Sequence, residues 1–150
     1  MSKVFFASDH AGFELKNALV EYVKTLGFEA VDKGNVEFEA LDDYPDFISL
    51  AAREVSQDPT SKGVVIGGSG QGEAIVANRF PNVRAALWYG GNMDIIKLSR
   101  EHNDANVLSL GARFVSIEEA KLALKTWLET PFSGDERHAR RIGKIDNLNI

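Results

Sequence analysis

The chain has 150 residues and a formal net charge of −5, from 17 basic and 22 acidic side chains. This length fits one domain, residues 1–150, with a substantial core. The negative charge gives no general attraction to nucleic acid or acidic lipid. The absence of cysteine excludes disulfides, thiolate metal sites and a cysteine nucleophile. The N-terminus turns polar too soon for a signal peptide, and no apolar stretch approaches the ~20 residues of a membrane helix, so we expect a cytoplasmic protein.

Short apolar runs and amphipathic segments alternate along the chain, which predicts strands separated by helices. Apolar residues recur at helical spacing from Leu15 to Leu26, and Gly27 is the expected stop. Ser116 with Glu119 three residues later is typical of a helix N-terminus. The predicted strands are 4–7, 29–31, 64–66, 84–87 and 106–110. The predicted helices are 15–26, 45–55, 73–79, 93–100, 116–129 and 135–146.

This alternation predicts an α/β fold, a three-layer αβα Rossmann-like arrangement with a five-stranded parallel sheet. Ligands of such sheets bind beyond the carboxyl ends of the strands. Three polar clusters, residues 8–10, 67–73 and 111–113, follow the first, third and fifth predicted strands. We expect them to meet at this edge, and Tyr44, in the connection after the second strand, is a candidate to join them.

The stretch Gly67-Gly68-Ser69-Gly70-Gln71-Gly72-Glu73 joins a predicted strand to a predicted helix. Four glycines in six residues allow backbone N–H groups to point together at an anion, and the helix adds its positive end. The spacing differs from both the dinucleotide fingerprint and the nucleotide P-loop. The alternative is a tight turn whose glycines serve packing alone. With a carboxylate beside the loop, the pattern favours proton chemistry next to a carbonyl.

Each acidic or basic candidate also has a structural interpretation. Glu73 could serve as a base, or it could only complement the dipole of the helix that it begins. Asp9 and His10 could exchange protons with a sugar hydroxyl or bind a phosphate, and Asp9 could equally cap the next helix. These two roles of Asp9 are compatible.

A basic cluster, residues 137–141, lies on the last predicted helix. Arg137 and Arg141 are four residues apart and share one face, which suits a phosphate dianion, and the alternative is a solvated charged face. Arg113 lies at a strand end. His102 precedes the fifth predicted strand, so we expect it at the opposite edge of the sheet from the other polar clusters.

Together these residues resemble the type B ribose-5-phosphate isomerases, a family that also holds galactose-6-phosphate and allose-6-phosphate isomerases. The resemblance covers essentially the whole chain. The segments that carry it are 8–16, 43–45, 68–73, 77–79, 100–103, 111–113 and 137–141.

One position departs from the pattern of many family members, which place a cysteine base where this chain has Gly67. A second branch of the family uses a glutamate after the last glycine of the loop, and Glu73 occupies that place. The chain therefore resembles the glutamate branch, with a glycine where the cysteine would stand.

The resemblance implies interconversion of D-ribose 5-phosphate and D-ribulose 5-phosphate in the pentose phosphate pathway, without cofactor or metal. It implies Glu73 as the base, Ser69 with loop N–H groups as donors to an enediolate, His102 in ring opening, and Asp9 as a helper. The substrate-binding residues that it implies are Asp9, His10, Tyr44, Gly68, Ser69, Gly70, Gly72, Asn103, Arg113, Arg137 and Arg141.

If His102 works with Glu73, a neighbouring subunit delivers it. We therefore expect a homodimer, or a tetramer, with shared active sites. Three alternatives stay open on the sequence. They are an isomerase for allose or galactose 6-phosphate, the latter with an unlike partner subunit, a nucleotide- or flavin-binding module, and a non-catalytic sugar-phosphate sensor.

Overall fold

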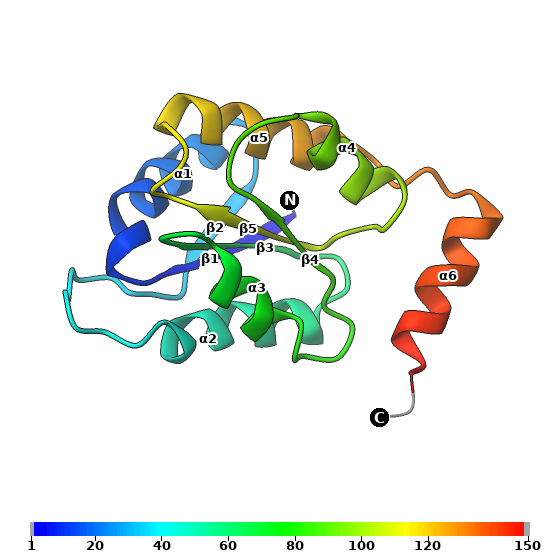
Figure 1. Ribbon diagram of the computed structural model, residues 1–150, viewed down its shortest axis with the longest axis horizontal. Coiled ribbons are helices and arrows are strands. Elements are labelled where there is room, and N and C mark those ends of the chain that lie inside the picture. Colours follow the sequence, from blue (N-terminus) through cyan, green and yellow to red (C-terminus); the bar gives the residue numbers. More distant parts are fainter. Residues whose placement is uncertain (1, 149–150) are drawn as a thin grey trace.

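Five parallel strands form one sheet in the order β2-β1-β3-β5-β4 (Figure 1). The computed structural model describes residues 2–148. The strands are β1 Lys3–Ser8, β2 Glu29–Asp32, β3 Lys62–Gly67, β4 Ala85–Trp88 and β5 Val107–Gly111. The helices are η1 (a 3₁₀ helix) His10–Gly12, α1 Phe13–Thr25, α2 Tyr44–Gln57, α3 Gln71–Ala77, α4 Asp94–Glu101, α5 Ile117–Glu129 and α6 Glu136–Asp146. The predicted α/β fold with five parallel strands is confirmed.

Helices cover both faces of the sheet, because successive strand residues point to opposite sides (Figure 1). Phe6 packs with α1 and α5 on one face, where Trp127 is fully buried. Phe5 packs with α2 on the other face, around Ile48. Complete burial of such side chains contributes about 1.5–3 kcal/mol each. The central strands β1, β3 and β5 are therefore buried on both sides, as their continuous apolar sequence requires.

Most boundaries lie within one or two residues of those predicted. The α5 start is a capping box, in which Ser116 Oγ accepts from the N–H of Glu119 and the Glu119 carboxylate accepts from the N–H of Ser116. The first helical segment begins earlier than Leu15, because Asp9 caps η1 and α1 follows directly at Phe13. The helix α3 begins at Gln71 instead of Glu73, since Gly70 already adopts the turn that precedes it.

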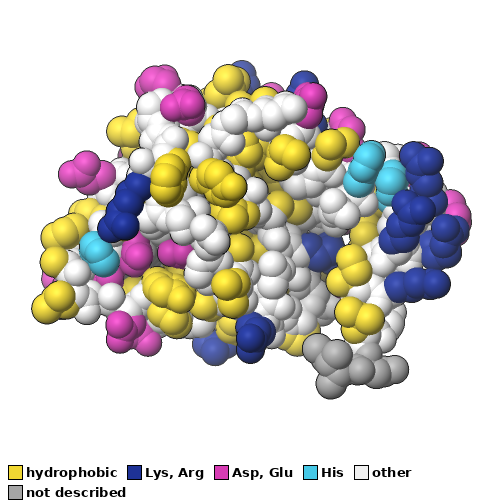
Figure 2. Space-filling view, in the orientation of Figure 1, with side chains coloured by type: hydrophobic (Ala, Val, Ile, Leu, Met, Phe, Trp, Pro, Cys, Tyr) yellow, Lys and Arg dark blue, Asp and Glu magenta, His cyan; other side chains and the backbone are white. Residues whose placement is uncertain are grey.

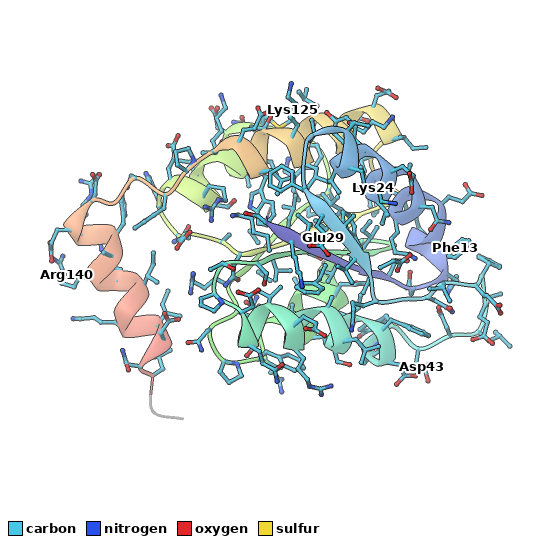
Figure 3. The ribbon with its side chains drawn as sticks, turned by 180° about the vertical axis from the view of Figure 1, so that it is seen from behind. Phe13, Lys24, Glu29, Asp43, Lys125 and Arg140 are labelled. Atoms are coloured by element: carbon cyan, nitrogen blue, oxygen red, sulfur yellow. The ribbon has the colours of Figure 1, made fainter. Side chains whose placement is uncertain are left out.

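The last helix, α6, lies beside the body of the protein and not against a face of the sheet (Figure 1). The view from behind shows the same separation, with Arg140 on the side of α6 away from the sheet (Figure 3). An ion pair between Arg84 and Asp146, at 3.6 Å, connects the body to this helix. Within residues 2–148, no helix is both long enough and apolar enough to span a bilayer.

Candidate active site

The central strands end side by side. Ser8 of β1 pairs with Ile66 of β3, and Gly67 of β3 pairs with Gly111 of β5. The three polar clusters that follow these strands therefore meet at one edge of the sheet, as predicted from the sequence. This edge holds Asp9 and His10, the glycine loop (residues 67–73) and Arg113.

The glycine loop is a preformed set of backbone donors. Gly70 has a φ of +81°, a conformation that favours glycine, and it turns the chain into α3. Ser69 Oγ accepts from the N–H of Gln71 at 3.3 Å. Within residues 2–148, the N–H groups of Ser69, Gly70 and Gly72 donate to no acceptor. An anion or a developing oxyanion at the loop would meet these groups together with the positive end of α3.

Ser109 of β5 fixes the conformation of this loop. Its hydroxyl, fully buried in β5, donates to the carbonyl of Gly70 at 2.6 Å. The carbonyls of Gly67 and Gly68 accept from the N–H groups of Ala112 and Arg113 at 2.8 and 3.0 Å. These bonds turn the loop carbonyls towards β5 and its continuation.

The carboxylate of Glu73 lies inside the site, since only 4% of this residue is exposed. A Cβ at position 67 would overlap the Glu73 carboxylate, so the absence of a side chain at Gly67 makes room for it. Burial raises the pKa of Glu73, the N–H of Glu73 itself opposes that rise, and the nearby charge of Asp9 adds to it. A carboxylate with a raised pKa is a stronger base than an ordinary glutamate, and such groups cluster at catalytic sites.

Asp9 performs the capping role that the sequence left open. One carboxylate oxygen accepts from the N–H groups of Ala11 and Gly12, at 2.9 and 3.2 Å. Asp9 is buried near Glu73, so the capping position also places its charge where it raises the pKa of Glu73. His10 follows, and its Nδ1 lies 2.8 Å from Oδ1 of Asp42.

Tyr44 and Arg113 contact the glycine loop. A Cβ on Gly72 would lie 2.8 Å from the Tyr44 hydroxyl oxygen, and a Cβ on Gly68 would lie 3.1 Å from a guanidinium nitrogen of Arg113. Both side chains therefore lie directly on the loop backbone. The structure thus brings together Asp9, His10, Tyr44, Glu73, Arg113 and the loop residues Gly68, Ser69, Gly70 and Gly72.

The other predicted residues lie elsewhere. His102 caps the end of α4, and its ring stacks on that of His138 with centroids 4.2 Å apart. Burial, followed by the charges of His102 and Arg137, lowers the pKa of His138. Arg137 and Arg141 are exposed on α6, where basic side chains gather on its outer side (Figure 2). Among residues 2–148, no hydrogen bond or ion pair links His102, Arg137 or Arg141 to the glycine-loop group.

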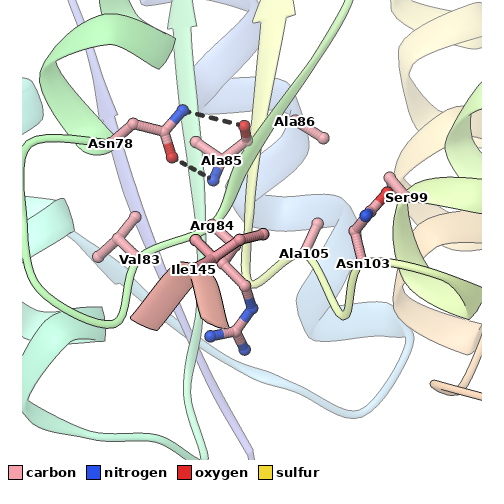
Figure 4. Close-up of a pocket in the computed structure, with 9 residues that line it drawn as sticks. All are labelled: Asn78, Val83, Arg84, Ala85, Ala86, Ser99, Asn103, Ala105 and Ile145. Carbon is pink, nitrogen blue, oxygen red and sulfur yellow. Dashed lines mark hydrogen bonds between the residues drawn. The ribbon is translucent and has the colours of Figure 1, made fainter. Parts of the chain in front are cut away.

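Asn103 lines a cavity of about 250 Å³ between α6 and the body (Figure 4). The close-up shows Ile145 of α6 on one side and the Asn78 side chain bonded to the backbone of Ala85 on the other (Figure 4). Glu73 and His10 do not line this cavity. The predicted site is therefore split, within one chain, into the glycine-loop group and an α4–α6 group (His102, Asn103, Arg137 and Arg141).

Comparison with known proteins places this geometry in a family. The family described as Ribose/Galactose Isomerase matches residues 4–145. This chain belongs to the ribose/galactose isomerase family. The ribose-5-phosphate isomerase B of Mycobacterium tuberculosis (strain H37Rv) is 41% identical over 140 residues, which are 93% of this chain and 85% of that protein. The corresponding protein of Escherichia coli K12 is 38% identical over 97% of this chain and 95% of its own.

Solved structures of family members have the same fold. The ribose-5-phosphate isomerase B of Mycoplasma genitalium, solved with bound ribulose-5-phosphate, has a TM-score of 0.91 at 41% identity, covering 96% of this chain and 93% of that chain. The protein of Anaplasma phagocytophilum has a TM-score of 0.89 at 46% identity, covering 97% of each chain.

Two residues at this isomerase-family site were missed by sequence reasoning. Ser109 alternates with apolar residues in β5, so its burial is expected, but its bond to the glycine loop depends on strand order. Asp42 stands in a polar loop next to Asp43, and adjacent acids usually face solvent. The only sequence signal was its place two residues before Tyr44.

Proposed function

We propose that this protein interconverts D-ribose 5-phosphate and D-ribulose 5-phosphate, with Glu73 as the base. Family membership supports aldose–ketose isomerisation, and relatives at about 40% identity are ribose-5-phosphate isomerases B. A solved relative binds ribulose-5-phosphate. The observation that carries the proposal is the buried Glu73 carboxylate at the start of α3, beside loop N–H groups that donate to no acceptor within residues 2–148.

The reaction moves a proton between C1 and C2 of the open-chain sugar. Glu73 removes the proton from C2 of the aldose, and the electron pair of that bond forms a C1–C2 double bond while negative charge develops on the C1 oxygen. The N–H groups of Ser69, Gly70 and Gly72 are donors for that oxygen, each worth about 3 kcal/mol in comparable sites. The proton of the C2 hydroxyl passes to the C1 oxygen, Glu73 delivers its own proton to C1, and C2 becomes the carbonyl carbon of the ketose.

Ring opening and phosphate binding fall to groups outside the glycine loop. The furanose must open before C2 can be deprotonated, and His102 is the group that we assign to this step. Arg137 and Arg141 offer two guanidinium groups on one exposed face for a phosphate. His10 and Arg113 complete the phosphate site from the glycine-loop side, and the remaining polar groups, Tyr44 and Asn103, contact the sugar.

These roles require two subunits, because one chain separates Glu73 from His102. We propose a homodimer in which the α4–α6 group of one subunit completes the glycine-loop group of the other. Two features support this arrangement. The helix α6 lies beside its own body (Figure 1), and its residues 139–141 are exposed. Exposed apolar side chains, Ile75 on α3 with Ile95 and Leu98 on α4, flank the sheet edge formed by β4.

The deciding experiment follows hydrogen exchange at C2 of ribose 5-phosphate in heavy water together with its conversion to ribulose 5-phosphate. Glu73→Gln should bind the sugar phosphate but lose turnover by about 1,000-fold, within the range of general-base contributions. Glu14→Gln is the matched control, since Glu14 also stands in the first turn of a helix but is exposed. Wild-type protein that neither converts ribose 5-phosphate nor exchanges its C2 hydrogen would overturn the proposed function, and a Glu73→Gln protein with normal turnover would remove Glu73 from its role.

A further inference from the structure

A second buried carboxylate, Asp42, is attached to His10. Only 1% of the Asp42 side chain is exposed, although residues 36–41 just before it are all exposed. Its Oδ1 lies 2.8 Å from Nδ1 of the His10 ring and also accepts from the His10 backbone N–H at 3.3 Å. One oxygen therefore holds both the main chain and the ring of the same residue, across 32 positions of sequence.

This arrangement is a poor source of stability. The second oxygen, Oδ2, is buried and makes no hydrogen bond within residues 2–148. Burying a carboxylate costs free energy unless both of its oxygens are paired. Attaching the loop to η1 does not require a charged side chain. A neutral side chain could attach the loop to η1 without that cost. The charge is therefore better explained by what it does to His10.

The Asp42 carboxylate determines which ring nitrogen of His10 is left without a hydrogen-bond partner in the described chain. An ionised carboxylate only accepts hydrogen bonds, so Nδ1 must carry a proton when it contacts Asp42. Nε2, across the ring, then makes no hydrogen bond within the described chain. The ring is also restrained on one side by Phe38, which packs edge-on at 6.4 Å between centroids. About a third of the His10 side chain stays exposed.

We propose that Asp42 is a positioning residue for substrate binding, which keeps the Nδ1 of His10 bonded inward and its Nε2 directed to the sugar phosphate. The kinetic part of this inference rests on the proposed function, in which His10 binds the phosphate. The alternative is that Asp42 only attaches the loop to η1. The two differ in whether the effect of Asp42 requires the His10 ring.

The first test reads the ring directly and needs no substrate. Nitrogen-15 NMR of the histidine rings, assigned by comparison with His10→Ala, should show Nδ1 of His10 protonated in the wild-type protein. Asp42→Ala should lose that signature, and Asp42→Asn should keep Nδ1 as the donor to the amide oxygen. Asp43→Asn is the matched control, because the neighbouring Asp43 is exposed and its side chain makes no capping bond. An unchanged His10 signature in Asp42→Ala would overturn the proposal even if the enzyme is active.

The second test is a double-mutant cycle on ribose 5-phosphate isomerisation, with inorganic phosphate as a competitive probe. Asp42→Ala should raise KM, and the inhibition constant of phosphate, about tenfold, as expected for a misplaced charge-assisted contact, with kcat changed less than about threefold. Asp42→Asn should raise KM less than Asp42→Ala does. Because asparagine keeps the shape of the side chain, this variant also serves as the control for loss of folding. In a His10→Ala background, Asp42→Ala should add nothing to KM. If Asp42→Ala raises KM equally in the wild-type and His10→Ala backgrounds, in proportion to the loss of thermal stability, the proposal is overturned.

Discussion

The Glu73 carboxylate lies beside Gly67, at the position where the Cβ of any other residue at 67 would stand. The glycine at the end of β3 is thus the counterpart of the glutamate at the start of α3. The two positions constrain each other, since a carboxylate can enter only if the strand end has no Cβ.

Gly67→Ala should therefore displace the carboxylate and lower kcat by about 100-fold, at the low end of general-base contributions. The fold should persist, because Gly67 does not have a positive φ and the group that must move is the end of a flexible side chain. Gly143→Ala on α6 is the control, since a Cβ there meets nothing within 4 Å among residues 2–148. Circular dichroism checks the fold. Normal turnover in Gly67→Ala would show that a side chain at position 67 does not displace the Glu73 carboxylate.

The raised pKa of Glu73 has opposite consequences for activity and for stability. Activity needs the carboxylate, so kcat/KM should fall on the acid side at a pH above that expected from the ordinary glutamate value of 4.5. The acid limb should shift in Glu73→Asp, which changes the position of the carboxylate, and stay unchanged in Glu14→Gln. An acid limb at the ordinary glutamate value would show that the buried base is not perturbed.

Stability should follow the reverse sign. A raised folded pKa means that the contribution of Glu73 is most favourable below its unfolded pKa and is lost as the pH rises through its folded pKa. Glu73→Gln, neutral at every pH, should therefore be more stable than the wild type at about pH 8 and lose that advantage by about pH 4. Urea unfolding of both proteins across this range measures the difference. A Glu73→Gln protein that is less stable at the alkaline end would contradict the prediction.

The shared-site homodimer predicts complementation. Glu73→Ala and His102→Ala proteins, each inactive, are mixed after dissociation and allowed to reassociate. Each mixed dimer then has one site with both residues and one with neither, so random pairing should restore about a quarter of the wild-type activity. Mixing Glu73→Ala with Glu73→Gln should restore none. Persistent inactivity despite mixed dimers, detected by mass, would show that Glu73 and His102 do not meet across subunits.

The basic face of α6 predicts a difference between neighbouring arginines. Arg141→Ala should raise KM for ribose 5-phosphate tenfold or more, because a charge-assisted contact to phosphate is lost, with a smaller change in kcat. Arg140 is the matched control, since it pairs with Glu136 at 2.7 Å on the same helix and points away from the sheet (Figure 3). Steady-state kinetics of Arg141→Ala and Arg140→Ala separate the two. Equal values of KM would remove the phosphate role of Arg141.

The sequence by itself determined the local features of this protein. Apolar periodicity predicted the strands and helices, because burial of a strand or of one helix face imposes a repeat that is visible in the residues. Glycine spacing predicted the loop at residues 67–73, since backbone donors can crowd together only without side chains. The order of strands and turns then indicated that Asp9, Glu73 and Arg113 belong to one edge, and that His102 does not.

Only the tertiary structure decided what depends on residues far apart in the chain. Strand order placed Ser109 beneath Gly70, and loop folding brought Asp42 to His10 across 32 positions. It also buried the Glu73 carboxylate in the space left by Gly67, which raises its pKa. Burial and desolvation are properties of all the surrounding atoms together, so no local pattern specifies them.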